Sequence, residues 1–285
     1  MPRGGVPAHP AFGYGGVYAQ CRREGIDVQQ LLFPLNKPQL DIVLPCYNPA
    51  KGWTAKVTEG FRQIQALLPG VELHFILVND GSSRAISQED IDGLKSALPD
   101  FTYLSYTPNR GKGHALRRGV AASRHACCIF TDVDFPYTPE SLVRIYRQLE
   151  AGETDVAVGI KDARYYAGIP VFRRRISKLL RWLIRTFLRI SITDTQCGLK
   201  GFNQRGKEVF LQTTIDRYLA DLEFIFLADR TPGLRMQAIA VELKPDVVFS
   251  QVSWKILLME GMNFSRVFLR SLITKKTPAK QMQAF

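Results

Sequence analysis

Apolar runs rich in β-branched and aromatic residues alternate with segments of helical spacing along the first 160 residues. Runs typical of strands occur at Leu40–Leu44, Leu73–Val78, Thr102–Tyr106, Cys127–Thr131 and Asp155–Gly159. Apolar residues recur at helical spacing within Trp53–Leu68, Gln88–Leu98, Gly113–Ala122 and Pro139–Leu149. Because strand–helix–strand units connect through right-handed crossovers, this order predicts an α/β fold whose mostly parallel sheet carries helices on both faces.

Helices predominate in the pattern beyond Gly159. We predict them around Val171–Ile190, Gly206–Gln212, Leu219–Asp229 and Val252–Leu272, with a short strand at Gln237–Leu243. Eight of the first sixteen residues are Gly or Pro, which predicts loose packing there. A chain of 285 residues can form two domains or one α/β domain with an added lobe. We expect one domain over residues 39–272, made of halves 39–160 and 161–272, between terminal tails at 1–38 and 273–285.

Composition restricts the environment of the chain. The five cysteines show no CxxC pairing, and Cys127 and Cys128 fall in a predicted buried strand, which indicates reduced thiols in the cytoplasm. No stretch has the length and charge-free character of a membrane span, and the N-terminus lacks the apolar core of a signal peptide. The net charge is +12. The segment from Lys161 to Arg189 contains nine basic residues and only one acidic residue.

Polar motifs follow three of the predicted strands. They are Pro45-Cys46-Tyr47-Asn48, Asn79-Asp80-Gly81-Ser82 and Asp132-Val133-Asp134. Ligands of such sheets bind beyond the carboxyl ends of the strands, so these motifs are expected to line one cleft. Two carboxylates two residues apart in extended chain point the same way and can hold Mg²⁺ or Mn²⁺ against a diphosphate. The alternative for the aspartate pair alone is a polar strand end.

Other phosphate-binding signatures are incomplete. Gly111-Lys112-Gly113 lacks the flanking residues of a P-loop, and no GxGxxG follows the first strand, which argues against a nucleoside triphosphatase or a dinucleotide enzyme. Pro136 stands where the aspartyl phosphatase motif needs Thr or Val, so that reading is a weak rival. Asn79–Ser83 and Asn109–Gly113 fit simple turns, although a lysine at a helix N-terminus also creates an anion site.

Together these motifs resemble the inverting family 2 glycosyltransferases of GT-A fold, a Rossmann-like architecture. The later motifs, Asp194-Thr195-Gln196-Cys197-Gly198-Leu199-Lys200 and Asp221-Leu222-Glu223, are similar to the branch that glycosylates dolichyl and other polyprenyl phosphates. The resemblance covers about Leu40–Leu272. It implies a nucleotide-sugar half at 39–160 and a helical acceptor half at 161–272. The chain departs from the family at Pro49 and at Gly159-Ile160-Lys161, which bear on the base and phosphate contacts. Asn79 replaces a frequent aspartate, which leaves the identity of the base open.

The resemblance also implies roles for individual residues. Pro45, Tyr47, Asn48, Asp80, Lys112 and Asp132 would bind the nucleotide sugar, a UDP- or GDP-hexose. Asp132 and Asp134 would hold Mg²⁺ or Mn²⁺, with Asp134 as the main ligand. Lys161, Arg173 and Ser177 would bind the phosphate of the acceptor, and arginine has planar donors suited to phosphate.

The basic segment bears on the choice of acceptor. Arg174, Lys178, Arg181, Arg185 and Arg189 recur at helical spacing among apolar residues, and Trp254–Phe268 adds a second apolar helix. Such helices suit a membrane surface, where each basic residue contributes about 1 kcal/mol near anionic lipid. We therefore expect a cytoplasmic protein bound peripherally to the membrane. The alternatives are a docked helix with a solvated basic face, or nucleic-acid binding, which is not expected because no reader motif is present.

The expected reaction is a single displacement that inverts the configuration at the anomeric carbon. A hydroxyl acceptor needs a base, for which Asp194, Asp221 and Glu223 are the candidates. A phosphate monoester, with a second pKa of about 6, is largely dianionic at neutral pH and needs positioning more than deprotonation. Two rivals remain: transfer to a glycan or lipid-linked saccharide hydroxyl, and a non-enzymatic basic protein that binds nucleotides or nucleic acid.

Overall fold

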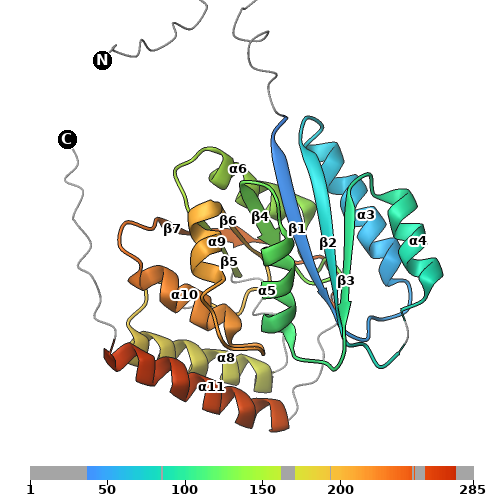
Figure 1. The fold of residues 1–285 in the computed structure, drawn as a ribbon. Coiled ribbons are helices and arrows are strands. Elements are labelled where there is room, and N and C mark those ends of the chain that lie inside the picture. Colours follow the sequence, from blue (N-terminus) through green and yellow to red (C-terminus); the bar gives the residue numbers. More distant parts are fainter. Residues whose placement is uncertain are drawn as a thin grey trace, which may run out of the picture. The chain divides into compact units, whose positions relative to one another are not determined.

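A computed structural model of the chain describes residues 37–84, 86–161, 171–192, 194–245, 247 and 254–273. The side chains of 171–174, 254–258 and 273 are outside this description. The centre of the fold is a seven-stranded sheet in the order β3-β2-β1-β4-β6-β5-β7 (Figure 1). Its strands are β1 (Gln39–Cys46), β2 (Glu72–Asp80), β3 (Phe101–Tyr106), β4 (Cys127–Phe130), β5 (Val156–Lys161), β6 (Lys200–Phe202) and β7 (Met236–Val241).

All the neighbouring strands are parallel except the pairs made by β6, which runs antiparallel to both β4 and β5. The predicted α/β class with a mostly parallel sheet is therefore confirmed. Strand β6 was not predicted, because its three residues, Lys200, Gly201 and Phe202, form no apolar run. Its insertion brings the segment before it, residues 194–199, between the ends of β4 and β5.

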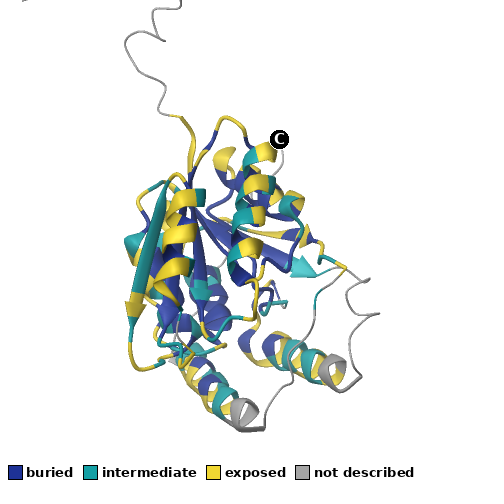
Figure 2. Cartoon of the chain, turned by 90° about the vertical axis from the view of Figure 1, so that its right-hand side faces the viewer, coloured by how far each residue is buried: buried dark blue, intermediate teal, exposed yellow. Residues whose placement is uncertain are grey.

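Helices cover both faces of the sheet, as predicted. Helices α3 (Trp53–Leu67), α4 (Gln88–Ala97) and α6 (Pro139–Glu150) pack on one face, and α5 (Lys112–Ala122), α9 (Gln204–Phe210) and α10 (Ala220–Arg230) on the other. Alternation along the strands supplies both cores: Ile42 and Leu44 pack with the first group and Val43 with the second. The strands between the helices are largely buried, whereas the helices turn exposed residues outward (Figure 2).

The segment predicted as one helix at Val171–Ile190 is divided in the structure. Helix α8 (Val171–Leu183) passes into a π-helical turn, η1 (Ile184–Leu188), which ends where Arg189 adopts a left-handed φ of 52°. Helix α11 (Trp254–Ile273) lies beside α8 (Figure 1), and the Phe187 and Phe268 rings meet edge to face with centroids 5.5 Å apart. Among the described residues, no helix combines the length and apolar character that crossing a membrane requires.

Asp155 connects β5 to two other segments of the second half. Its buried carboxylate accepts hydrogen bonds from Asn203 Nδ2 (2.9 Å), from Arg205 Nη1 (3.0 Å) and from the backbone and guanidinium of Arg235 (2.8–3.2 Å). Burial alone would raise the pKa of this carboxyl, but the hydrogen bonds from Arg235 and Asn203 and the charge of Arg205 lower it to about 2.

We expect Asp155→Asn to lower the free energy of unfolding at pH 7 by about 2 kcal/mol, because each unit of pKa shift corresponds to about 1.4 kcal/mol. A carboxyl with a lowered pKa in the folded state stabilises the protein above its ordinary pKa and loses this effect as the pH falls through the folded value. Urea unfolding should therefore show the gap between wild type and variant closing between about pH 4 and pH 2. A gap of constant size over that range would contradict the prediction.

Candidate active site at the carboxyl edge of the sheet

Strands β1, β2 and β4 end at one edge of the sheet, and the loops that follow them meet there. Cys46 pairs with Asn79 at the ends of β1 and β2. Just beyond, the Asn48 backbone N–H donates to Ser82 Oγ (3.0 Å), and its side chain bonds to Ser83 Oγ and accepts from the Arg84 backbone N–H. Tyr47, which lies between Cys46 and Asn48 in the chain, is 51% exposed. The first two predicted motifs thus form one hydrogen-bonded rim with an open aromatic ring.

Asp80, at the end of β2, organises the loop before α5. Its buried carboxylate accepts hydrogen bonds from Tyr106 Oη (2.9 Å), Asn109 Nδ2 (2.8 Å) and the backbone N–H groups of Arg110 (2.8 Å) and Gly111 (2.9 Å). Each donor lies within the protein, so the carboxylate is already well satisfied. Asp80 therefore holds the loop that presents the first residue of α5, Lys112.

Lys112 points from the start of α5 to the aspartate pair. Its ammonium lies 2.5 Å from Asp132 Oδ1. Burial would lower the pKa of Lys112, but the charges of Asp132 and Asp221 raise it by more, so the group stays cationic. The neighbouring glycine lets the start of α5 pack closely, because a Cβ on Gly113 would come within 2.4 Å of the Ile215 carbonyl oxygen.

The Asp-Val-Asp segment forms a turn, which corrects the expectation of an extended strand end. Strand β4 stops at Phe130, and the Phe135 backbone N–H donates to the Asp132 carbonyl (3.0 Å). Phe135 is buried with a left-handed φ of 48°. Asp134 is exposed, and its pKa is raised by partial burial of the carboxylate and by the negative charge of Asp132. The two carboxylates are therefore close enough to repel one another.

This arrangement fits a divalent cation. Two neighbouring carboxylates supply the hard oxygen atoms that Mg²⁺ and Mn²⁺ prefer, although Lys112 already pairs with Asp132. Asp134 is open to solvent, so substrate oxygens or water could complete the coordination.

The segment 194–199, ahead of β6, lies directly against the aspartates. A Cβ on Gly198 would come within 2.5 Å of Asp132 Oδ2, so only glycine allows this approach. The Gly198 backbone N–H donates to the buried Tyr137 hydroxyl (3.0 Å). At the other end of the segment, Asp194 Oδ2 accepts from the Lys161 backbone N–H (2.9 Å), and Lys161 Nζ lies 3.3 Å from the Gln196 carbonyl. The structure thus brings Lys161, Asp194 and Asp132 to one region.

Asp221 and Glu223, at the start of α10, are both engaged within the protein. Asp221 Oδ1 lies 2.5 Å from the ammonium of Lys200, which is fully buried and also donates to the Cys197 carbonyl. The Glu223 carboxylate accepts from Thr214 and Ile215 backbone N–H groups (2.7 and 2.8 Å) and from Arg270 Nη1 (3.1 Å). Glu223 therefore anchors α11 and the loop that packs on α5.

The remaining candidate residues lie on α8 and at the end of β1. On α8, Ser177 is half-buried, and the side chain of Arg173 lies outside the described residues. Pro45, in β1, is half-buried.

Three residues that shape the site received no individual role from the sequence: Tyr137, and Gly198 and Lys200 of the motif that begins at Asp194. The role of Lys200 could have been inferred from the sequence. A lysine that follows the apolar Leu199 is expected to be partly buried, and a buried ammonium needs a carboxylate partner. Tyr137 carried no signal, and the motif that contains Gly198 did not reveal its contacts with Tyr137 and Asp132, which arise only when β6 enters the sheet.

Comparison with known proteins agrees with this architecture. The profile described as glycosyl transferase family 2 matches residues 41–210. The mostly parallel sheet, with polar motifs gathered at the carboxyl ends of its strands, defines an α/β protein of GT-A-like architecture. The chain belongs to glycosyl transferase family 2, and the predicted resemblance is confirmed at this level.

Several relatives carry the name dolichyl-phosphate beta-glucosyltransferase. The chain is 26% identical over 238 residues to dolichyl-phosphate beta-glucosyltransferase of Saccharomyces cerevisiae, covering 75% of this chain and 71% of the relative. It is 26% identical over 252 residues to the Drosophila melanogaster protein of the same name, covering 82% and 76%. It is also 26% identical over 215 residues to glycosyltransferase AglD of Haloferax volcanii, covering 73% of this chain but 33% of that longer protein.

Solved structures share the fold at low sequence identity. Glucosyl-3-phosphoglycerate synthase from Mycobacterium tuberculosis, in complex with UDP, superposes with a TM-score of 0.59 at 15% identity, covering 95% of this chain and 88% of that one. Mannosyltransferase PcManGT from Pyrobaculum calidifontis, in complex with GDP-Man and Mn²⁺, gives a TM-score of 0.52 at 15% identity, covering 86% and 67%. Both support the GT-A-like fold.

Proposed function

We propose that the protein transfers a hexose, with inversion, from a UDP- or GDP-sugar to a polyprenyl phosphate at a membrane surface, with Mg²⁺ or Mn²⁺ bound. The observation that carries the proposal is the cluster of Asp132, Asp134, Lys112 and the 194–199 segment at the carboxyl edge of the sheet. The names of the relatives, and the nucleotides and metals bound by proteins of similar fold, support the donor and acceptor classes.

On the donor side, we assign the nucleoside to the rim formed by β1 and β2. The exposed Tyr47 ring and the half-buried Pro45 offer an apolar surface for the base, and Asn48 holds the two loops together. Asp80 acts through the Asn109–Gly111 loop that it positions. In this assignment the base is read by shape and stacking, which is consistent with either uracil or guanine.

On the leaving-group side, Asp132 and Asp134 would hold the cation, which when bound offsets negative charge on the departing diphosphate. Lys112 places a second positive charge at the same point, held there by Asp132. Fixed charges of this kind cost no reorganisation when the bond breaks. The acceptor oxygen attacks from the opposite face of the sugar, so the configuration inverts.

On the acceptor side, the engagement of the carboxylates favours a phosphate over a hydroxyl. Asp221 is paired with Lys200 and Glu223 is bonded to the 214–215 backbone, so neither is free to take a proton. Asp194 is half-buried and bonded to the Lys161 backbone. We assign Asp194, Asp221 and Glu223 to positioning, and Lys161, Arg173 and Ser177 to the acceptor phosphate.

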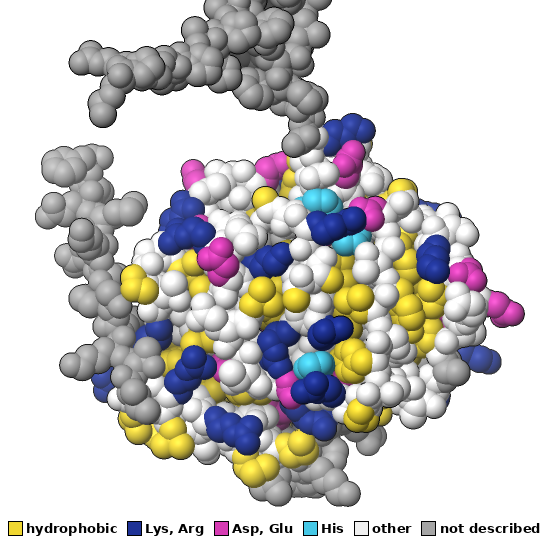
Figure 3. Space-filling view, viewed as in Figure 1, with side chains coloured by type: hydrophobic (Ala, Val, Ile, Leu, Met, Phe, Trp, Pro, Cys, Tyr) yellow, Lys and Arg dark blue, Asp and Glu magenta, His cyan; other side chains and the backbone are white. Residues whose placement is uncertain are grey.

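Helices α8 and α11, with η1, supply a surface for the lipid. Large apolar side chains on them are exposed, namely Leu179, Trp182, Phe187, Met262, Leu269 and Leu272. Lys178 and Arg185 are exposed on two of these elements, α8 and η1. Figure 1 places α8 and α11 at the lower edge of the molecule, and basic and apolar side chains lie side by side along that edge in Figure 3. This combination is typical of helices that lie in a bilayer interface. The same end of the fold carries the strand carboxyl ends (Figure 1).

To test the proposal, the purified chain is incubated with Mn²⁺, with vesicles that contain polyprenyl phosphate, and with radiolabelled UDP-glucose or GDP-mannose. We expect a lipid-extractable product whose sugar is released by mild acid, because a sugar phosphodiester is acid-labile. An acid-stable lipid product would favour a saccharide hydroxyl as the acceptor. No sugar transfer, together with tight, steeply salt-dependent RNA binding, would favour the non-enzymatic alternative.

A further inference from the structure

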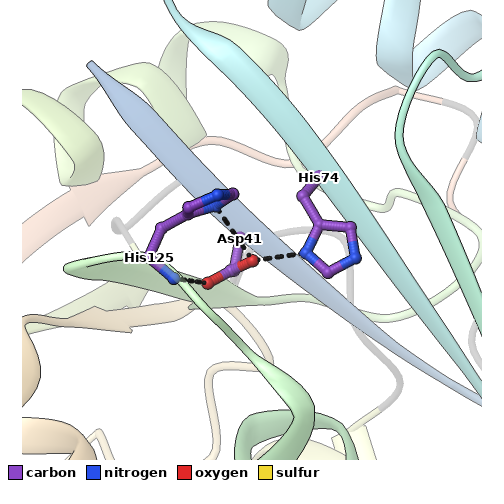
Figure 4. Close-up of side chains that lie close together, drawn as sticks. All are labelled: Asp41, His74 and His125. Atoms are coloured by element: carbon purple, nitrogen blue, oxygen red, sulfur yellow. Dashed lines mark hydrogen bonds and ion pairs between the residues drawn. The ribbon is translucent and has the colours of Figure 1, made fainter. Parts of the chain in front are cut away.

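A second cluster of polar side chains lies near the amino ends of the strands, away from the aspartate pair. It consists of Asp41 on β1, His74 on β2 and His125 in the turn between α5 and β4 (Figure 4). Asp41 and His74 are the third residues of their strands and are paired in the sheet register. The proposed transfer reaction uses none of the three residues.

The three side chains converge on one point. Asp41 Oδ1 lies 2.5 Å from His74 Nδ1 and 3.2 Å from His125 Nδ1, and the three candidate ligand atoms lie within 4.8 Å of one another. Asp41 and His74 are almost completely buried, and the side chain of His125 is 13% exposed. His125 Nδ1 is itself buried and has no hydrogen-bond partner in the described part of the chain, although it faces the carboxylate. An unsatisfied buried ring nitrogen calls for an explanation.

The remaining polar atoms of the buried pair fix its orientation. Asp41 Oδ2 accepts from the backbone N–H groups of Arg124 (2.8 Å) and His125 (2.6 Å). His74 Nε2 lies 2.8 Å from Thr102 Oγ1, which sets the plane of the imidazole. Metal-binding histidines and carboxylates are held in this way, with the second polar atom of each ligand bonded to the protein.

We infer that Asp41, His74 and His125 form a second metal site, which binds a zinc-class divalent transition ion and joins β1, β2 and the α5–β4 turn. Two imidazole nitrogens and one carboxylate oxygen suit such an ion better than Mg²⁺, which prefers oxygen ligands. A water molecule would complete four-fold coordination on the partly exposed His125 side. On binding, a ring that is protonated on both nitrogens releases one proton to solvent, and a neutral ring that carries its proton on Nδ1 shifts it to Nε2.

The ionisation of Asp41 is compatible with this site. Burial raises the pKa of its carboxyl, but the hydrogen bonds from His74 and the His125 backbone, with the nearby imidazoles, lower it overall. The carboxylate is therefore charged at neutral pH, as a metal ligand must be. The pair Asp132 and Asp134 offers oxygen atoms alone, so the two sites should prefer different metals.

The test titrates the EDTA-treated full chain with Co²⁺ and follows the visible absorption bands of four-coordinate cobalt. We expect the four-coordinate bands to report a single site per chain, to disappear when Zn²⁺ displaces Co²⁺, and the melting temperature to rise with Zn²⁺. His125→Gln should weaken binding at least about a hundredfold, and Thr102→Val, which only frees the His74 ring, about ten- to a hundredfold. The matched control His114→Gln changes a histidine outside the cluster and should leave the bands unchanged, as should Asp134→Asn.

Three outcomes would overturn the inference. They are the absence of cobalt bands in the wild type, bands that persist unchanged in both His125→Gln and Thr102→Val, and a thiolate charge-transfer band that assigns the ion to cysteine. Since Thr102→Val retains all three ligands, a folding failure of His125→Gln still leaves a decisive variant. The readout is independent of sugar transfer, so its failure would leave the proposed reaction standing.

Discussion

Asp134→Asn is expected to reduce metal-dependent sugar transfer by at least about a hundredfold while raising the melting temperature of the metal-free protein. The loss follows because a bound cation contributes several kcal/mol of charge stabilisation, and each 1.4 kcal/mol is about a factor of ten in rate. The gain in stability follows because Asp132 and partial burial raise the pKa of the Asp134 carboxyl. A carboxyl with a raised pKa in the folded state begins to cost stability as the pH rises above its ordinary pKa, and the cost is complete above the folded value.

The stability gain should therefore be present at pH 7 and disappear below the ordinary carboxyl pKa, where both forms are neutral. Differential scanning fluorimetry with and without Mn²⁺ measures both effects: Mn²⁺ should raise the melting temperature of the wild type and not that of the variant. Asp92→Asn, an exposed acid on α4, is the matched control and should change neither quantity. Undiminished turnover in Asp134→Asn would remove Asp134 from the mechanism.

Replacing Asp221 alone is expected to destabilise the protein by about 3–5 kcal/mol, because it leaves the buried ammonium of Lys200 without its carboxylate. The double variant Lys200→Met with Asp221→Leu should recover most of this loss, since apolar side chains can replace a buried ion pair with little cost. Urea unfolding of the wild type, the two single variants and the double variant measures the coupling.

Turnover should not recover in the double variant. The charge of Asp221 also acts on Lys112, which faces Asp132 at the site, so removing the ion pair changes the electrostatics there. Recovered stability with lost transfer would identify the Lys200–Asp221 pair as a positioning element of the site. A double variant no more stable than Asp221→Leu alone would contradict the ion-pair account, and full turnover in it would contradict the functional one.

Local patterns determined much of the fold. The alternation of strand and helix signals predicted β1 to β5 and the helices between them, because a strand that packs on both faces carries an apolar run and a helix carries its stripe every third or fourth residue. The same patterns placed Asn48, Asp80 and Asp132 at strand ends, and parallel strands bring such ends together. These inferences need only short-range spacing.

Long-range packing decided the rest. Strand β6 is three residues long, so only its partners β4 and β5 make it a strand, and with it came the contact of Gly198 with Asp132. The aspartate pair became a turn because Phe135 is buried in the core, which spacing along the chain does not reveal.

The sequence by itself therefore determined the class of fold and the edge of the sheet where polar motifs gather. Tertiary structure alone decided which polar groups are already occupied. Nothing in the sequence marks the carboxylates of Asp80, Asp221 and Glu223 as paired. In the structure each accepts hydrogen bonds from groups 8 to 47 residues away along the chain. Likewise, Asp41, His74 and His125 form a cluster only because two strands and a turn converge, and burial then requires their polar atoms to be paired.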